Sequence, residues 1–159
     1  MDPNVRKRTL RLLSNGVYII TSRWGDRFGA ATVTWVSQAS FKPPLLMAAI
    51  RKESSAFRCM SQSQVAALHI VGSRQCALAQ KFFAPTLAGP GLINGEPFTD
   101  GETAAPILEN APAYLECRIR QIIEDGGDHD IVVMEVVNAR WREPLEPLTI
   151  AQSPWEYGG

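Results

Sequence analysis

The segment at residues 29–44 constrains the fold of this chain more than any other. Its sequence, GAATVTWVSQASFKPP, has the β-branched and aromatic residues of a buried strand, yet it carries four hydroxyl side chains: Thr32, Thr34, Ser37 and Ser40. A hydroxyl group that is buried without a partner costs roughly 1–3 kcal/mol. A strand that repeats such groups and then stops at two prolines indicates either a site for a flat polar ligand or a solvated strand face rich in threonine.

The remaining pattern predicts a mainly β protein with short helices. Helices are expected at residues 4–13 (capped by Asn4), 54–60 and 74–83, and strands at 17–24, 28–41, 45–50, 65–71, 113–123 and 131–141. Gly25-Asp26 joins the first two strands as a hairpin. Because strands and helices do not alternate regularly, the pattern favours a closed or split antiparallel barrel over a Rossmann sheet.

The whole chain, residues 1–159, is expected to form one domain, with the N-terminal helix inside residues 1–14. Residues 84–106 are rich in Gly, Pro and Thr and are long for a plain connection, so a loop that acts as a lid or binds a ligand is expected. Residues 150–159 form a C-terminal tail, and its end, 154–159, is expected to be an extended surface segment.

The composition excludes several classes of function. Sixteen basic and sixteen acidic residues cancel, which argues against a nucleic-acid or membrane surface. No apolar run approaches the ~20 residues that span a bilayer, and residues 1–13 lack a signal-peptide pattern, so a cytoplasmic protein is expected. The three cysteines, Cys59, Cys76 and Cys117, lack metal-ligand spacing and are expected to be reduced, with no metal bound.

An anion site is indicated where the expected second helix begins, at Arg51-Lys52-x-Ser54-Ser55. Free N–H groups at a helix start, two cations and two hydroxyls together suit a phosphate group. The alternative is an ordinary capped helix with solvated charges, in which Ser54 or Ser55 is the N-cap.

The two histidines have different expected roles. His129 follows Gly127 and Asp128 at the mouth of the last hairpin, where it could orient a polar ligand or simply bond to Asp128. His69 lies inside an apolar strand and is expected to be a core histidine with satisfied hydrogen bonds. Gln75 could lie near a ligand, although core packing explains its helix equally well.

Several segments, taken in order, resemble the flavin reductase-like, FMN-binding split-barrel family. They extend from about residue 8 to 148, and no single motif among them is decisive. The resembling residues are 10–13 with 15–21, the whole of 29–44, 65–71 followed by Gln75, Leu78-Ala79 and Phe82, and finally Glu116-Cys117, Gly127-Asp128-His129 and Glu135-Val136.

This resemblance implies a homodimeric split barrel that binds FMN or FAD near the subunit interface and takes hydride from NADH or NADPH. Contacts to the isoalloxazine and ribityl groups are implied for Thr32, Thr34, Ser37 and Ser40. Contacts to the flavin phosphate are implied for Arg51, Lys52, Ser54 and Ser55. His129, as the histidine of the family's Gly-Asp-His motif, would lie near the nicotinamide. The chain departs from the family pattern at His69, Asp130 and Met134.

The leading hypothesis is therefore an NAD(P)H-dependent flavin reductase, whose reduced flavin serves a monooxygenase or another electron acceptor. A flavin-binding electron carrier without direct NAD(P)H oxidation, and a split-barrel dimer without flavin, are the alternatives. The choice between FMN and FAD stays open because no adenine pocket is evident in the sequence. The choice between NADH and NADPH stays open as well.

Overall fold

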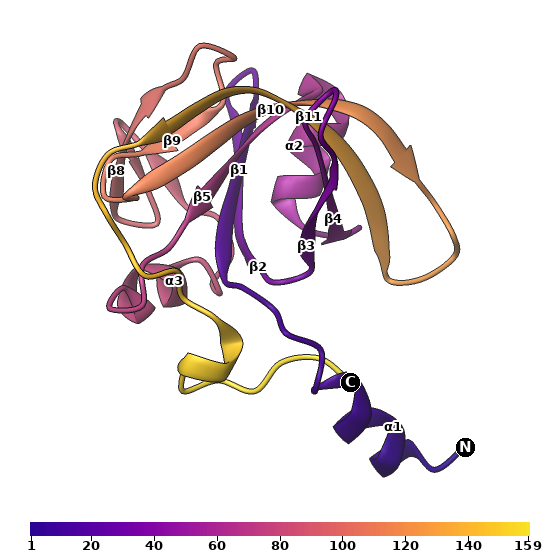
Figure 1. Ribbon diagram of the computed structural model, residues 1–159. Helices are drawn as coiled ribbons and strands as arrows, with labels where there is room; N and C mark the ends of the chain where they lie inside the picture. The colour runs from indigo at the N-terminus through magenta and orange to yellow at the C-terminus, as the bar shows by residue number, and fades with distance from the viewer.

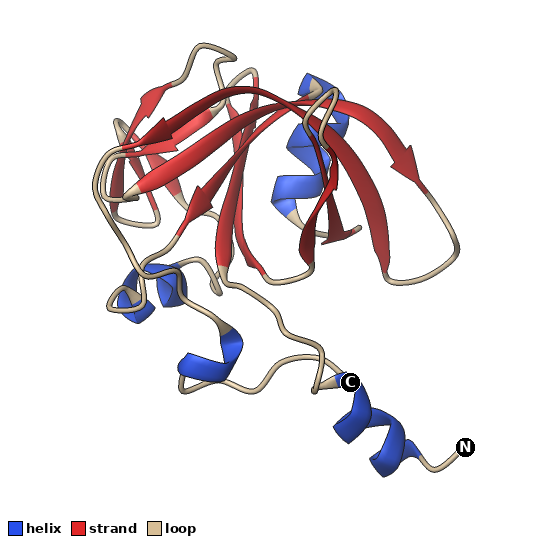
Figure 2. Cartoon of the chain, viewed as in Figure 1, coloured by secondary structure: helices blue, strands red, loops and turns tan.

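The computed structural model describes residues 1–159 and consists mainly of antiparallel strands (Figure 2), as the sequence predicts. The larger sheet has seven strands in the order β2-β1-β5-β10-β11-β4-β3. Its strands are β1 (Tyr18–Trp24), β2 (Arg27–Val33), β3 (Val36–Ser40), β4 (Leu45–Arg51), β5 (Val65–Ile70), β10 (Ala113–Ile123) and β11 (His129–Trp141). A smaller sheet contains β6 (Ala88–Gly89), β7 (Leu92–Ile93), β8 (Glu96–Asp100) and β9 (Pro106–Leu108).

The chain has three α-helices and one 3-10 turn: α1 (Pro3–Leu10), α2 (Ser55–Ser63), α3 (Cys76–Lys81) and η1 (Ile150–Gln152). Asp2, and not Asn4, caps α1, because the Asn4 N–H donates to Asp2 Oδ1. No residue of α1 is buried, and the helix ends before the predicted residue 13. Ser54 caps α2 as predicted, accepting a hydrogen bond from the Phe57 N–H at 3.1 Å.

The predicted strand at residues 28–41 is two strands, so that prediction is wrong. β2 pairs with β1 at one edge of the sheet, whereas β3 pairs with β4 at the other edge. The chain therefore passes from edge to edge at Thr34 and Trp35, and β2 and β3 do not pair with each other. This β2–β3 seam leaves the barrel split (Figure 1), which is the fold class that the sequence predicts.

The core lies on both faces of the larger sheet. Ile19 belongs to a buried cluster that includes Leu78 of α3, while its neighbour Ile20 belongs to a second cluster that includes Met60 of α2. Successive side chains of a strand point to opposite faces, so β1 buries both. This explains why the strand opens with the consecutive apolar residues Tyr18, Ile19 and Ile20 and shows no alternation there.

Residues 84–106, predicted as a loop, contain the short strands β6, β7 and β8, so the loop prediction is wrong for those residues. β6, β7 and β8 form successive antiparallel pairs, and β9 completes the smaller sheet. Buried Glu96, the first residue of β8, accepts hydrogen bonds from Lys81 at the end of α3 and from Asn110 between β9 and β10. Only its first residues, 84–86, reach the cavity described below.

No helix of the chain is both long enough and apolar enough to cross a membrane. The three cysteines are free, as predicted, and Cys59 and Cys117 are buried. Burial, with the nearby Glu116 carboxylate, raises the pKa of Cys117 to about 12.

His69 is a core residue with both ring nitrogens bonded, as the sequence predicts. The Leu108 N–H donates to Nε2 at 3.0 Å, so the ring proton is on Nδ1 and is donated to the Ile19 carbonyl at 3.0 Å. Burial lowers the pKa of His69 from 6.5 to about 4. The neutral ring therefore joins β5 to β1 and β9.

We expect His69 to make stability depend on pH. Below pH 6.5 the unfolded chain takes up a proton at this residue, while the folded chain does so only near the lowered pKa of about 4. Its contribution to the free energy of unfolding is thus complete above pH 6.5 and falls by about 3 kcal/mol on acidification to pH 4. Urea unfolding at a series of pH values should show a smaller decline for His69→Asn than for the wild type. An equal decline in both proteins would contradict this assignment.

Candidate functional site

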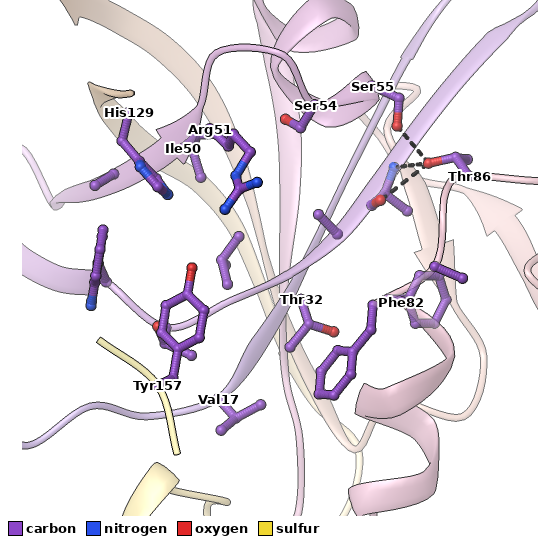
Figure 3. Close-up of a pocket in the computed structure, with 18 of the residues that line it drawn as sticks. Val17, Thr32, Ile50, Arg51, Ser54, Ser55, Phe82, Thr86, His129 and Tyr157 are labelled. Atoms are coloured by element: carbon purple, nitrogen blue, oxygen red, sulfur yellow. Dashed lines mark hydrogen bonds between the residues drawn. The ribbon is translucent and has the colours of Figure 1, made fainter. Parts of the chain in front are cut away.

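One large cavity, of about 880 Å³, opens beside the β2–β3 seam (Figure 3). Its walls come from β2, the start of α2, residues 82–86, His129 and the C-terminal residues 155–157. This volume lies within the range of about 300–1,000 Å³ that is typical of small-molecule sites.

Two of the four predicted hydroxyl residues line the cavity. Thr32 Oγ1 donates to the Ala79 carbonyl at 2.6 Å. Thr34 is buried, and its Oγ1 has no hydrogen-bond partner in the protein. Ser37 and Ser40 lie on β3 outside the lining, and Ser37 Oγ donates to the Gln38 carbonyl. Because leaving a buried hydroxyl unpaired is costly, Thr34 indicates a position where a ligand atom would be bonded.

The other end of the cavity is cationic. Arg51 ends β4, Ser54 and Ser55 begin α2, and Arg58 follows one helical turn later. Neither arginine has a carboxylate within ion-pair distance. The acidic residues of the cavity lining are Glu53 and Glu156. Together with the positive end of the α2 dipole, these groups favour an anion such as a phosphate.

Lys52, predicted to belong to this cationic group, lies outside the cavity lining. Its Nζ is 3.1 Å from Oδ1 of the buried Asp130, and Asp130 follows His129 on β11. The alternation of β4 explains the difference, because adjacent side chains of an extended segment point to opposite sides. Sequence reasoning on spacing alone treated both cations as equivalent.

His129 lies among aromatic side chains at the cavity wall. Its ring is 4.8 Å from that of Trp35, centroid to centroid, and Trp35 is 5.6 Å from Tyr157. Nδ1 of His129 is 2.7 Å from the exposed Asp128 carboxylate, and this hydrogen bond lowers the pKa of Asp128. The register of β11 on β4 pairs His129 with Arg51, which brings the histidine and the cationic end into one wall (Figure 3).

The C-terminal residues 154–159 form no helix or strand and none of them is buried, as the sequence predicts, and Trp155, Glu156 and Tyr157 also line the cavity. Trp155 packs edge-on against Phe83, with ring centroids 4.8 Å apart. Arg11, just after α1, holds the tail through Nη1 to Glu156 at 2.7 Å and through Nε to the Gly158 carbonyl at 2.9 Å. The C-terminus therefore lies against the end of α1, whereas the N-terminus lies at the far end of that helix (Figure 1).

Sequence reasoning missed several lining residues: Trp35, Arg58, Thr86, Trp155 and Tyr157. Arg58 could have been found, since it stands four residues after Ser54 and shares its helix face. The others depend on long-range packing and have no local pattern. Gln75 is structural, because it accepts from the Gly72 N–H and donates to the Asn110 carbonyl.

Comparisons with known proteins match nearly the whole chain. Residues 10–156 match the flavin reductase like domain. An NADPH-flavin oxidoreductase from Streptomyces viridifaciens is 34% identical over 134 residues, which cover 83% of this chain and 69% of that protein. Diflavin flavoprotein A 1 from Synechocystis sp. is 33% identical over 141 residues, which cover 88% of this chain. The chain spans about a quarter of the length of diflavin flavoprotein A 1, because the match covers 24% of that protein.

Solved structures show the same fold. An NADH:FAD oxidoreductase from Streptomyces globisporus superposes with a TM-score of 0.78 at 24% identity, covering 94% of this chain and 90% of that one. The styrene monooxygenase flavin reductase from Pseudomonas putida S12 superposes with a TM-score of 0.76 at 20% identity, covering 92% and 91%.

We expect Arg11 to hold the tail over the cavity. The Arg11→Ala variant loses the contacts to Glu156 and Gly158, worth about 1 kcal/mol together at a partly exposed site, so amide hydrogen exchange in residues 154–159 should become about fivefold faster. Arg8→Ala is the matched control, because Arg8 is exposed on α1 and forms no ion pair. Unchanged exchange in Arg11→Ala would show that aromatic packing alone holds the tail.

Proposed function

The chain belongs to the flavin reductase like family, and we propose that it transfers hydride from NADH or NADPH to a flavin, FMN or FAD, held in the large cavity. The observation that carries the proposal is that the two parts of this cavity differ in chemistry. One part has the unpaired Thr34 hydroxyl and aromatic side chains, and the other has Arg51 and Arg58 near the start of α2. NADPH-flavin oxidoreductase and NADH:FAD oxidoreductase activities are named for relatives of this chain and support the proposal.

The donor set of the cavity fits a flavin. Thr34 Oγ1 offers an unpaired donor or acceptor to the polar edge of a flat ring, and the surrounding lining is largely apolar. Arg51, Ser54 and Ser55 lie at the start of α2, where a phosphate is stabilised by N–H groups and positive charge. Ser37, Ser40 and Lys52 lack access to this cavity within one chain, so we omit them from the proposed flavin contacts.

His129 is proposed to orient the nicotinamide. Its ring is fixed by the Asp128 carboxylate on one side and by Trp35 on another, which leaves it a positioned polar group at the cavity wall. When bound, the flavin would supply the redox chemistry by accepting the hydride, so no protein base is required. Met134 is fully buried in the core and does not line the cavity, so this departure from the family pattern does not narrow the cavity.

The proposed partners follow from the same relatives. The styrene monooxygenase flavin reductase is named as part of a monooxygenase system, which favours a monooxygenase or another acceptor as the consumer of the reduced flavin. A homodimer and a cytoplasmic location are further proposals.

The first test is anaerobic flavin reduction. The protein is loaded with FMN or FAD, NADH or NADPH is added, and the oxidised flavin absorbance is followed. Rapid bleaching with either nucleotide supports the proposal. Photoreduction of the same sample is the control, because it shows that the bound flavin is redox-competent without any nicotinamide.

A second candidate function is a flavin-binding electron carrier without direct NAD(P)H oxidation. The observation in its favour is Tyr157, which packs on Trp35 beside His129 and so covers the place proposed for the nicotinamide. Flavin that binds and is photoreduced, yet stays oxidised with both nucleotides, would favour this candidate. A protein that binds neither flavin would contradict both functions.

We expect Arg51→Ala to weaken FMN binding by about ten- to a hundredfold, because a hydrogen bond to a charged group contributes about 1.5–3 kcal/mol. Ser37→Ala should leave the dissociation constant within about twofold, since Ser37 is exposed and outside the cavity. Titration of flavin fluorescence measures both. Equal losses in the two variants would place the phosphate elsewhere.

We expect His129→Ala to raise the KM for NAD(P)H by about tenfold, as loss of one positioning contact predicts. Flavin affinity should change little, because the arginines and α2 are untouched. Steady-state kinetics and flavin titration separate the two effects. A parallel loss of flavin binding, or no change in either quantity, would contradict the nicotinamide role.

A further inference from the structure

A second cavity, of about 500 Å³, adjoins the first one. It lies between the β1–β2 turn and the outer face of α2, and it shares three lining residues with the large cavity: Ser55, Arg58 and Thr86. The sequence alone gave no indication of this second cavity, because its walls come from three separate segments.

The second cavity has the chemistry of a nucleotide site. Arg27 and Arg58 both line it, and neither forms an ion pair. The Arg27 guanidinium lies 5.6 Å from the ring centroid of Trp24, which is 46% exposed. An aromatic ring with a neighbouring guanidinium offers stacking to a purine, and free arginines suit its phosphate. Asp26 is the single carboxylate of the lining.

The boundary between the two cavities is polar. Ser55 Oγ and Thr86 Oγ1 are 2.6 Å apart, and Thr86 Oγ1 is also bonded to the backbone of Ala30 (Figure 3). Arg58 faces both cavities from the next turn of α2. Because Ser55 and Thr86 are bonded to each other and to Ala30, Arg58 is the boundary residue with free donors, and its guanidinium suits a pyrophosphate.

We propose that the second cavity binds the adenosine monophosphate portion of FAD, so that this chain takes FAD in preference to FMN. The inference rests on the proposed function, because it requires the flavin ring in the large cavity. An adenylate is also part of NADH and NADPH. We assign it to FAD because the second cavity continues from the cationic end, at Ser55 and Arg58, whereas the nicotinamide is proposed at His129.

Binding of FMN and FAD, each without nicotinamide, tests this assignment. Isothermal titration should give at least a tenfold lower Kd for FAD than for FMN in the wild type. Arg27→Ala and Trp24→Ala should each raise the Kd of FAD about tenfold and leave that of FMN within twofold. Trp24→Phe, which keeps an aromatic ring, should restore most of the affinity for FAD. Arg118→Ala is the matched control, since Arg118 is exposed on β10 and lines neither cavity.

The outcomes separate the two proposals. Equal affinity of the wild type for FMN and FAD, or equal loss of both flavins in Arg27→Ala, would overturn the adenylate site and leave the flavin function standing. Binding of neither flavin would overturn both. A raised KM for NADH in Arg27→Ala, with unchanged FAD affinity, would assign the cavity to the nicotinamide nucleotide and also overturn the inference.

Discussion

The close contact between α2 and β2 at Gly29 is the constraint on which the rest of the structure depends. A Cβ atom at residue 29 would lie within van der Waals overlap of the Ser55 backbone, 2.2 Å from its carbonyl oxygen. Only glycine lets the start of α2 approach the strand this closely. Both cavities share Ser55 as a lining residue, so this single packing distance sets the position of the cationic end relative to the hydroxyl strand.

The register between β11 and β4 determines where His129 lies relative to Arg51. The pairing of β11 with β4 places His129 opposite Arg51, although 77 residues separate them in the sequence. A slip of one residue would turn every side chain of β11 to the other face, burying the histidine and exposing Asp130. The proposed nicotinamide and phosphate contacts therefore depend on the same ladder of backbone hydrogen bonds.

Local physics made part of this structure predictable from the sequence. Ser54 or Ser55 is predicted as the helix cap because serine is among the residues preferred at that position, and His69 is predicted in the core because its strand is apolar. The break at Thr34 and Trp35 was not predictable, since both residues favour strands and nothing local ends one. Trp155 contacts Phe83, Tyr157 contacts Trp35, and Glu156 between them bonds to Arg11, which lies 145 residues earlier. Contacts between residues so far apart in the sequence leave no pattern in a short stretch of neighbouring residues.

The position of the C-terminal residues has a consequence for any protein joined after them. Arg11 bonds to both Glu156 and Gly158, so a polypeptide fused after Gly159 would begin beside the mouth of the large cavity. A short tether would then keep the fused domain at a high effective concentration near that opening. Under the proposed function, delivery of electrons to such a domain would become an intramolecular event, independent of the protein concentration.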